Sequence, residues 1–332
     1  MKALAPISAI FGAGVSLRNS MYDHGMLKAR KLKWPVVSVG NLSVGGAGKT
    51  PLTILLGRLL QKRQIAFDVL SRGYGRSDSK IRLVNEKGSP TDYGDEPLLL
   101  ANKLSVPVIV GADRYAAGKH AEQLFSEVQP AHSGRWLHLL DDGFQHRGLY
   151  RDFDIVVVPQ CDAVGKLLPE GRLREPLTSL RRANAIVLGP NQSTSELPIE
   201  RQKVWRVERK ITVKNVADRP IAFCGIANPK RFFDDLQSSG VEVLGEIVFS
   251  DHHAYREADV RSLLRKREEA NSSGFITTEK DAMNLRRLPQ EWLRQLEPIS
   301  IVELEMTLIN PEEAMQHLLE VIGESLQHAA KG

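Results

Sequence analysis

The stretch SVGGAGKTP, from Ser43 to Pro51, constrains the fold of this chain more than any other feature. It follows the apolar run WPVVSVG and precedes LTILLGRLL, whose apolar residues recur at helical spacing. A strand, a glycine-rich turn and Lys-Thr at the start of a helix make up a P-loop. Glycines let backbone N–H groups converge on phosphate oxygens, and the helix N-terminus adds positive potential. The pattern therefore predicts a nucleotide-phosphate site in an α/β domain.

The residues of this loop have separate expected roles. Lys49 would reach the β- and γ-phosphates, and the Thr50 hydroxyl would ligate Mg²⁺. The usual pattern is GxxxxGK[ST], and Ser43 stands here in place of the first glycine. A glycine-rich turn that binds nothing is the bland alternative, and a dinucleotide-binding turn would have no use for Lys-Thr. The expected ATP-binding residues are Ser43, Val44, Gly45, Gly46, Ala47, Gly48, Lys49 and Thr50.

An acidic pair follows a second apolar run, in WLHLLDDGFQH. A strand that ends in Asp141 and Asp142 resembles the Walker B arrangement, which holds Mg²⁺ or its waters at the carboxyl edge of a sheet. An acidic turn of no function is the alternative. A separate Asp/His metal site is disfavoured because no second His or Cys stands nearby at ligand spacing.

Apolar, β-branched runs alternate with helix-period runs along the chain, which predicts a mostly parallel sheet with helices on both faces. The expected strands are 34–39, 65–70, 106–110, 136–140, 153–158 and 185–188, and helices are expected at 52–61, 97–103, 115–125 and 177–182. The alternation restarts near Asp218 with strands 221–224, 241–248 and 275–277 and helices 230–237 and 257–269. The runs 204–213 and 299–308 could pair as a two-stranded connector between the lobes.

These patterns divide the chain into four parts. Residues 1–33 would form an N-terminal helix and a basic segment, and residues 34–203 the P-loop domain. Residues 204–308 would form the smaller α/β lobe with its connector strands. Residues 309–332 would form a last helix that packs on the first domain, with Asn310 as N-cap and Pro311 at the first helical position.

The N-terminus is uncharged from Ala3 to Leu17, which is too short to span a bilayer. Leu4, Ile7, Phe11 and Val15 share one helical face, and five basic residues follow between Arg18 and Lys33. Such a helix can lie in an anionic membrane interface. It can equally pack on the core of its own domain, and the pattern alone leaves both possibilities open.

Four further loops are rich in functional groups: LSRGYGR, YGDEP, LPEGRLREP and FSDHHAY. In YGDEP, Asp95 could simply cap a helix whose dipole favours Glu96. LPEGRLREP could be a solvated charged loop. The Asp-His-His cluster in FSDHHAY only modestly favours a functional role, because histidines are often structural.

The motifs NLSVGGAGKTP, LSRGYGR, GDEP, DDGFQH, GRLREP, FCGIANP, FSDHHAY and TTEKDAMN occur here in the order and spacing of one family. The chain resembles the tetraacyldisaccharide 4'-kinases, the lipid A 4'-kinases of Gram-negative bacteria. The resemblance runs from the apolar N-terminus to Asn284, and a serine in place of the first glycine belongs to this family's form of the loop.

The resemblance implies transfer of the γ-phosphate of ATP to the 4'-hydroxyl of an acylated glucosamine disaccharide 1-phosphate, with Mg²⁺. It also implies peripheral attachment to the cytoplasmic face of the inner membrane, with no nucleic acid and no obligate protein partner. Asp95 would be the base for the acceptor hydroxyl, and His252 would pair with it from the second lobe. Lys49 would be catalytic, while Thr50, Asp141 and Asp142 would surround the metal. Expected substrate contacts are Arg72, Tyr74, Arg114, His146, Arg174 and Glu175.

Two other classes remain to be weighed. A regulatory GTPase would need Asn/Thr-Lys-x-Asp, but Lys280 and Asp281 in TTEKDA are adjacent, so that pattern fails. A nucleic-acid-dependent ATPase is suggested only by the net charge of +5, and the chain has scattered basic residues and no stacking motif. The two distant cysteines form no CxxC pair, which is typical of a reducing compartment.

Overall fold

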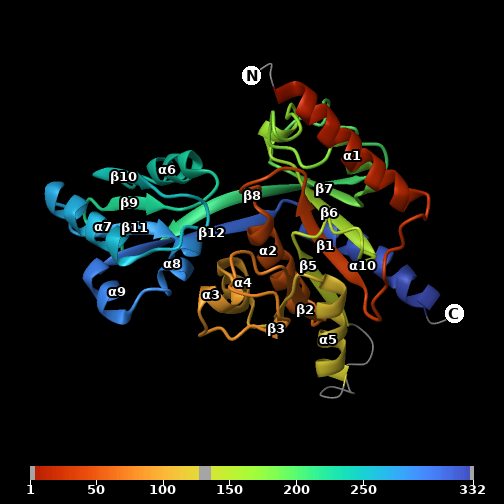
Figure 1. The fold of residues 1–332 in the computed structure, drawn as a ribbon, viewed down its shortest axis with the longest axis horizontal. Coiled ribbons are helices and arrows are strands. Elements are labelled where there is room, and N and C mark those ends of the chain that lie inside the picture. The colour runs from red at the N-terminus through yellow and green to blue at the C-terminus, as the bar shows by residue number, and fades with distance from the viewer. Residues whose placement is uncertain (1–3, 127–135, 330–332) are drawn as a thin grey trace.

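The computed structural model describes residues 4–126 and 136–329, which fold into two α/β lobes joined by two long strands (Figure 1). The first lobe contains α1 (Ala5–Asp23), β1 (Val36–Asn41), α2 (Lys49–Lys62), β2 (Ala66–Ser71), β3 (Arg82–Leu83), α3 (Pro90–Tyr93), α4 (Asp95–Leu104), β4 (Val108–Val110), α5 (Arg114–Ser126), β5 (Trp136–Asp141), β6 (Phe153–Val157), the 3₁₀ turns η3 (Gln160–Asp162) and η4 (Leu177–Arg182), β7 (Ala185–Leu188) and the final helix α10 (Pro311–Ala329). The second contains β9 (Ile221–Cys224), α6 (Pro229–Ser238), β10 (Gly245–Val248), α7 (Glu257–Glu269), β11 (Phe275–Thr278), α8 (Glu279–Leu285) and α9 (Gln290–Leu296). The connecting strands are β8 (Lys203–Val213) and β12 (Ile299–Leu308).

One sheet runs through both lobes in the order β10-β9-β11-β12-β8-β7-β6-β1-β5-β2-β4-β3. The β8–β12 and β3–β4 pairs are antiparallel, whereas all other neighbouring pairs are parallel. β8 begins beside β7 at Lys203 and continues to Val213, where it pairs with Val302 of β12. The predicted fold class, including the two-stranded connector, is therefore confirmed.

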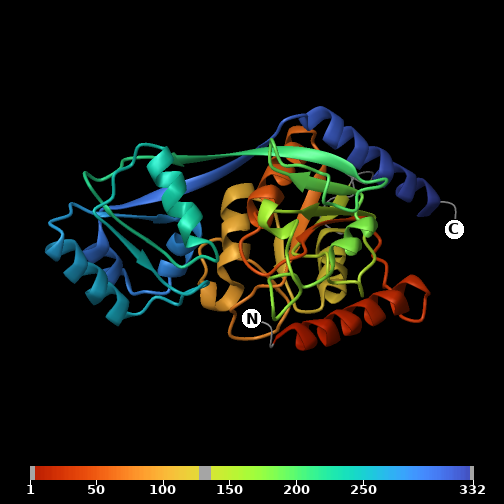
Figure 2. The ribbon, with the colours of Figure 1, turned by 90° about the horizontal axis from the view of Figure 1, so that it is seen from above.

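Helices cover both faces of the first lobe's sheet. On one face, β1, β5 and β6 pack against α2, α4 and α10 around Leu52, Leu100 and Met315. On the other face, α5 packs through Ala117 and Ala121. Figure 2 shows α10 and α1 on opposite sides of this lobe. β1 ends at Asn41 and α2 begins at Lys49, so the P-loop follows the carboxyl end of a strand inside the sheet.

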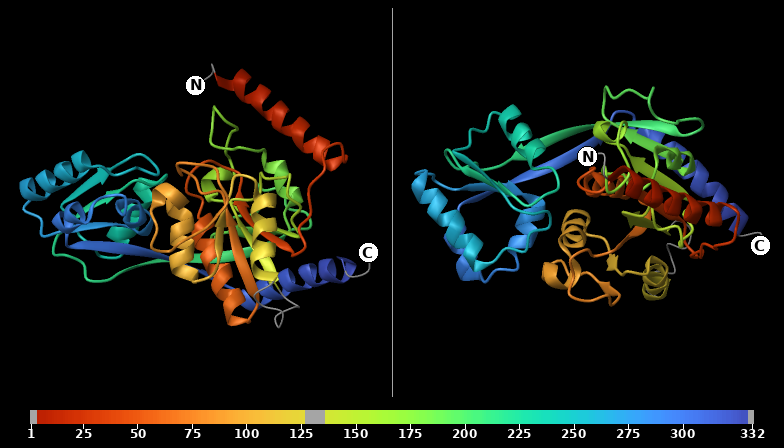
Figure 3. Two further views of the ribbon diagram at one scale, coloured as in Figure 1. Left: turned by 60° about the horizontal axis from the view of Figure 1, so that its bottom comes forward. Right: turned by 45° about the horizontal axis from the view of Figure 1, so that its top comes forward.

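The second lobe has its own three-layered core. α7 and α9 pack on one face of its strands around Phe223 and Phe275. α6 packs on the other face through Phe232 and Leu236. The two lobes lie side by side with α4 and α8 between them (Figures 1 and 3).

The packing of α1 differs from its apolar pattern. Its buried residues are Ser8, Gly12 and Asn19, and a Cβ at Gly12 would lie 2.7 Å from Leu167, so the helix approaches the 160–175 loop closely. Of the expected apolar face, Leu4 and Ile7 are exposed, and Phe11 and Val15 are only partly buried. Ile10 and Leu17 are 74% and 64% exposed. The apolar side chains of α1 therefore mostly face outward.

Several expected element bounds were wrong for local reasons. β1 starts at Val36 instead of residue 34, because the N–H groups of Lys33 and Trp34 donate to Glu122. β10 starts at Gly245 instead of residue 241, since the Val241 N–H closes the end of α6 by bonding the Leu236 carbonyl. Residues 177–182, expected as an α-helix, form a 3₁₀ turn after Pro176.

Candidate active site in the cleft between the lobes

A cleft of about 530 Å³ lies between the lobes and receives residues from most of the sequence motifs. Its lining includes Val44, Gly45, Gly46, Ala47, Gly48, Lys49, Thr50, Arg72, Tyr74, Glu96, Asp141, Asp142, Arg174, Asp251, His252 and Lys280. The first lobe supplies the expected phosphate loop and the acidic pair, whereas the second lobe supplies the histidine.

The 43–48 loop is held open by its glycines and by two arginines. Gly45 and Gly48 have φ angles of 94° and 93°, values that a side chain at these positions would strain. Arg174 Nε donates to the Ser43 carbonyl over 3.0 Å, and Arg172 Nη2 donates to the Val44 carbonyl over 2.9 Å. The GRLREP segment thus fixes the outer rim of the loop.

Lys49 lies between an amide and a carboxylate at the base of the loop. Its Nζ donates to Asn41 Oδ1 over 3.2 Å and lies 3.6 Å from Asp142 Oδ1. Arg174 Nη1 lies 3.5 Å from the other Asp142 oxygen. Burial raises the pKa of Asp142, but the charges of Lys49 and Arg174 outweigh burial and hold that pKa below its usual value.

The neighbouring Asp141 has the opposite electrostatic surroundings. Burial, then the charges of Glu96 and Asp142, raise its pKa to about 7. Thr53 Oγ1 donates to Asp141 over 3.2 Å. In the part of the chain that the structure describes, Asp142 Oδ1 is buried without a hydrogen-bond donor. Thr50, Asp141 and Asp142 line the same cleft, so their oxygen atoms could together bind a cation.

Asp95 and His252 meet across the two lobes, one at the start of α4 and the other after β10. His252 Nδ1 lies 2.9 Å from Asp95 Oδ2 and 3.1 Å from Oδ1. Asn284 Nδ2 donates to Asp95 over 2.8 Å, and the Glu96 N–H donates over 2.9 Å. Burial raises the pKa of Asp95, but the His252 hydrogen bond and the Lys280 charge lower it overall.

The two members of this pair differ in exposure. The Asp95 side chain is 3% exposed, and His252, which is 20% exposed, faces the cleft. Tyr74 also lies there, with its ring centroid 4.8 Å from that of His252. Asp95 is therefore behind His252 when the lobes are in this arrangement.

Arg114 and His146 lie beneath the cleft lining, near Arg72. Burial and the charge of Arg72 lower the pKa of Arg114 to about 10. Burial and the charge of Arg114 lower the pKa of His146 to about 4. Arg114 Nη1 donates to the Ala112 carbonyl over 2.7 Å, and its buried Nε has no acceptor among the described residues.

Glu175 is placed differently from the expectation of a substrate contact. It is buried at the back of the GRLREP segment, where it accepts from Asn19 Nδ2 and Arg182 Nη2, both at 2.8 Å. It therefore joins α1 to the loop that holds the P-loop, and faces away from the cleft.

Three polar residues of the site have no role in the motif-based expectations: Glu96, Lys280 and Asn284. Lys280 Nζ lies 3.2 Å from Glu96 Oε1 and 3.1 Å from His252 Nε2, so TTEKDAMN lies against the Asp95–His252 pair. For Lys280 and Asn284, the only sign of function in the sequence was that TTEKDAMN resembles a family motif, and that resemblance gave neither residue a role.

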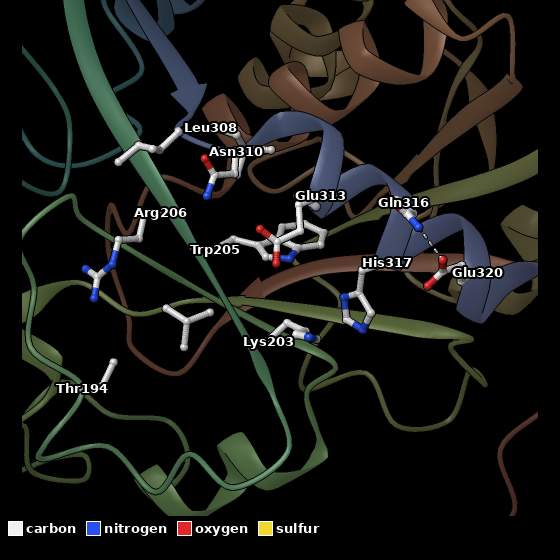
Figure 4. A pocket seen from close by; sticks show the side chains of 13 residues that line it. Thr194, Lys203, Trp205, Arg206, Leu308, Asn310, Glu313, Gln316, His317 and Glu320 are labelled. Atoms are coloured by element: carbon white, nitrogen blue, oxygen red, sulfur yellow. Dashed lines mark hydrogen bonds between the residues drawn. The ribbon is translucent and has the colours of Figure 1, made fainter.

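A second cavity, of about 470 Å³, lies between β8 and α10 (Figure 4). Lys203, Arg206, Glu313 and His317 line it, and none of its described lining residues belongs to the motifs. Arg206 is occupied by the carbonyls of Gly189, Pro190 and Gln192. The cleft between the lobes is thus the better candidate for the active site.

Comparisons with known proteins agree over nearly the whole chain. A model of the family described as Tetraacyldisaccharide-1-P 4'-kinase matches residues 1–323. The Tetraacyldisaccharide 4'-kinase of Koribacter versatilis (strain Ellin345) is 49% identical over 327 residues, covering 96% of this chain and 98% of the relative. That of Chlorobaculum tepidum is 35% identical, covering 88% and 89%. The crystal structure of the "apo" form of LpxK from Aquifex aeolicus in complex with ATP is similar with a TM-score of 0.76 and 31% identity, covering 97% of this chain and 99% of that one.

Proposed function

The chain belongs to the tetraacyldisaccharide-1-P 4'-kinase family, enzymes of lipid A synthesis, and from this premise we propose how its cleft carries out ATP-dependent 4'-phosphorylation. The phosphate loop would bind ATP, the compound present in the Aquifex aeolicus complex. The acceptor would be the acylated glucosamine disaccharide 1-phosphate. One observation carries this proposal: the P-loop of the first lobe and the Asp95–His252 pair lie at the same cleft.

The residues around Thr50 fit a magnesium ion. Mg²⁺ typically binds one or two carboxylates together with phosphates and waters. Asp142 has a buried oxygen without a donor in the described chain. Burial first, then the charges of Glu96 and Asp142, raise the pKa of Asp141, so a cation there would stabilise its ionised form. Thr50, Asp141 and Asp142 would hold the ion, which supplies charge neutralisation on the nucleotide phosphates.

Lys49 and the loop amides would hold the transferring phosphate. Phosphoryl transfer has a loose transition state, so catalysis depends mainly on alignment and charge stabilisation. Lys49 is 12% exposed and already held by Asn41, which limits the reorganisation needed on binding. Arg174 would add positive charge from the rim of the loop.

The Asp95–His252 pair would accept the proton of the sugar hydroxyl. As the hydroxyl oxygen bonds to phosphorus, its O–H bond breaks and the proton passes to the carboxylate. Arg72 and Tyr74 line the same cleft and would contact the acceptor. Arg114, with its unused buried Nε, would support this side by placing positive charge near Arg72, whereas His146, whose pKa is lowered, would be neutral there.

The outward apolar side of α1 supports a peripheral position on an anionic membrane, the inner membrane's cytoplasmic face. Ile7, Ile10 and Leu17 are exposed there. Such surface is suited to the headgroup–acyl boundary, where basic residues gain from anionic lipid. Among the described residues, no helix combines the length and hydropathy that a bilayer crossing requires.

The test is direct. The purified protein is incubated with γ-labelled ATP, Mg²⁺ and the acylated disaccharide 1-phosphate in mixed micelles, and label in the lipid is measured. The same preparation is assayed with GTP. Transfer of label to the 4' position from ATP supports the proposal, whereas label released only as inorganic phosphate contradicts it.

A further inference from the structure

Lys280 of α8 has no role in the function proposed above, although it contacts the Asp95–His252 pair. Its Nζ lies 3.1 Å from His252 Nε2, 3.2 Å from Glu96 Oε1 and 3.6 Å from Asp251 Oδ1. Its side chain is 19% exposed. One ammonium group thus contacts both lobes and the histidine that joins them.

The charge of Lys280 is fixed by its neighbours. Burial lowers the pKa of Lys280, but the carboxylates of Glu96, Asp95 and Asp251 outweigh burial and raise that pKa above its usual value. An ammonium group has hydrogen-bond donors and no acceptor. If the 3.1 Å contact with Lys280 is a hydrogen bond, Nε2 of His252 is its acceptor, which requires that Nε2 carry no proton.

The other ring nitrogen must then carry the proton. A neutral imidazole has one N–H, and with Nε2 accepting, that N–H is on Nδ1. Nδ1 lies 2.9 Å from Asp95 Oδ2, a distance at which an N–H on Nδ1 donates a hydrogen bond to the carboxylate. The two contacts of His252 are therefore consistent with a single tautomer.

The same contacts distinguish the possible proton acceptors. The lone pair of Nε2 is occupied by Lys280. A carboxylate has about four lone-pair sites, and Asp95 receives donors from His252, Asn284 and the Glu96 N–H. By the number of donors it receives, Asp95 thus retains acceptor capacity for a hydroxyl that reaches it, and Nε2 of His252 does not.

The backbone at His252 indicates that the ring position is imposed. His252 has a φ of 57°, a region that is rare for residues other than glycine. Its N–H bonds the Gly225 carbonyl over 3.1 Å, and the Gly225 N–H bonds the buried Asp281. Lys280 and Asp281 are consecutive, so one turn of helix holds both the loop and the ring of His252.

We propose that Lys280 is a positioning residue that keeps His252 as the neutral Nδ1–H tautomer and so leaves Asp95 as the proton acceptor of the pair. The inference rests on the proposed function, because it assigns roles within the same site. Asp95, Glu96, Asp251 and Lys280 are the charged groups that face the ring.

Removal of Lys280 changes the balance at His252. Burial lowers the pKa of His252, and the Asp95 hydrogen bond and charge raise it overall, with Lys280 among the groups opposing that rise. Without Lys280 the imidazole would gain a second proton and pair with Asp95 as a cation. The carboxylate would then be a weaker base, because a cation stabilises its ionised form.

The experiment reads the tautomer directly. Protein with ¹⁵N-labelled histidine is examined by NMR at pH 7 without substrate, and the His252 signals are assigned by their loss in His252→Gln. Lys280→Met, Lys280→Arg and the control Lys103→Met are compared. Lys103 also pairs across the lobes, with Glu279 and with Glu303 at 3.3 Å, but does not touch the ring.

Wild type, Lys280→Arg and Lys103→Met are expected to show a protonated Nδ1 and a bare Nε2, whereas Lys280→Met shows both nitrogens protonated. In the transfer assay, Lys280→Met should lower kcat by about tenfold to 10²-fold, below a full loss of base catalysis, with the KM for ATP nearly unchanged. Lys280→Arg should recover most of this loss.

Two results would overturn the role of Lys280: a protonated Nε2 in wild type, or an unchanged tautomer in a folded Lys280→Met protein. Absence of transfer by wild type would instead overturn the proposed function, because the spectra are recorded without turnover.

Discussion

The Asn19 side-chain amide donates a 2.8 Å hydrogen bond to the Glu175 carboxylate, which ties the N-terminal helix to the GRLREP segment. The preceding residue, Arg174, donates to the carbonyl of Ser43 in the phosphate loop. The surface helix and the nucleotide loop are therefore linked through two adjacent residues. α1 is thus part of the support of the active site as well as an apolar surface.

Asn19→Ala should lower stability, because it removes a donor from a buried carboxylate that has one oxygen without a partner in the described chain. Arg182 still donates to the same oxygen, so we expect a cost of about 1.5–3 kcal/mol, the usual contribution of a hydrogen bond to a charged group. Thermal unfolding measures it, and Ser16→Ala, on the exposed side of the same helix, is the control. Equal melting temperatures for both variants would show that the contact contributes nothing.

The membrane role of α1 can be tested at its outward side chains. Ile10→Ser with Leu17→Ser should reduce co-sedimentation with anionic vesicles, because both side chains are exposed and apolar. Val248→Ser, at an exposed apolar residue of the second lobe, should leave binding unchanged. Turnover of detergent-solubilised substrate should persist in all variants. Full vesicle binding by the double variant would contradict the proposed interface.

Lys49→Ala should abolish most phosphoryl transfer while the protein remains folded. The expected loss in kcat is on the order of 10²–10³-fold, as for removal of one preorganised charge-stabilising donor. Thr50→Ala should raise the Mg²⁺ concentration needed for half-maximal rate. Lys62→Ala, in the last turn of the same helix, is the matched control. Turnover close to wild type in Lys49→Ala would exclude the P-loop mechanism.

The Asp95–His252 pair should behave as one unit. Asp95→Ala should reduce kcat by about 10²–10⁴-fold, and His252→Ala somewhat less. The double variant should be scarcely slower than Asp95→Ala, because groups that act together give non-additive losses. Steady-state kinetics on the four proteins decides this, and multiplicative losses would indicate independent roles. If Asp95→Ala lowers the melting temperature but leaves kcat nearly normal, Asp95 acts only as a helix cap and has no catalytic role.

Buried His138 predicts a pH dependence of stability. Burial lowers its pKa, but the charge and hydrogen bond of Asp68, 2.9 Å away, outweigh burial and raise the pKa to about 9. Because the folded value exceeds the usual 6.5, this stabilisation is complete below about pH 6.5 and is lost as the pH rises through 9. The shift corresponds to roughly 3 kcal/mol.

Melting temperatures between pH 6 and 10 test this prediction. Wild type and the control His120→Gln should lose stability across the window, whereas His138→Gln, less stable throughout, should lack that slope. A wild-type profile that stays level between pH 6.5 and 9 would show that His138 is neutral in the folded protein.

The sequence allowed prediction of those parts of the fold and site that depend on local residue patterns. The P-loop was recognisable because strand, glycines, Lys49 and helix are contiguous. The β-branched runs marked the buried parallel strands, which are apolar on both faces. The pairing of β8 with β12 was suggested by their imperfectly alternating patterns on either side of the second lobe.

The remaining features depend on contacts between distant segments. Lys280 lies 28 residues from His252 and 184 from Glu96, so no spacing rule relates them. The packing of α1 was left open because periodicity identifies an apolar face without saying whether protein or another medium covers it. The side of α1 that faces the protein is instead the one that carries Gly12, where the helix approaches Leu167 closely. Glu175 was expected to contact substrate from the family resemblance, and its position in the sequence does not reveal which way its side chain points.

The return of the chain through β12 to α10 has a consequence for biosynthesis. Met306, Leu308, Met315 and Leu318 belong to the same core cluster as Val37 and Leu52. A ribosome therefore releases the P-loop segment long before the residues that complete its core exist. In the sequence, the second lobe lies wholly between β8 and β12. It can therefore complete its own core before the last residues of the first lobe's core have been synthesised. The order of folding would then reverse the order of synthesis, and apolar strands of the first lobe would need protection from aggregation until the last helix emerges.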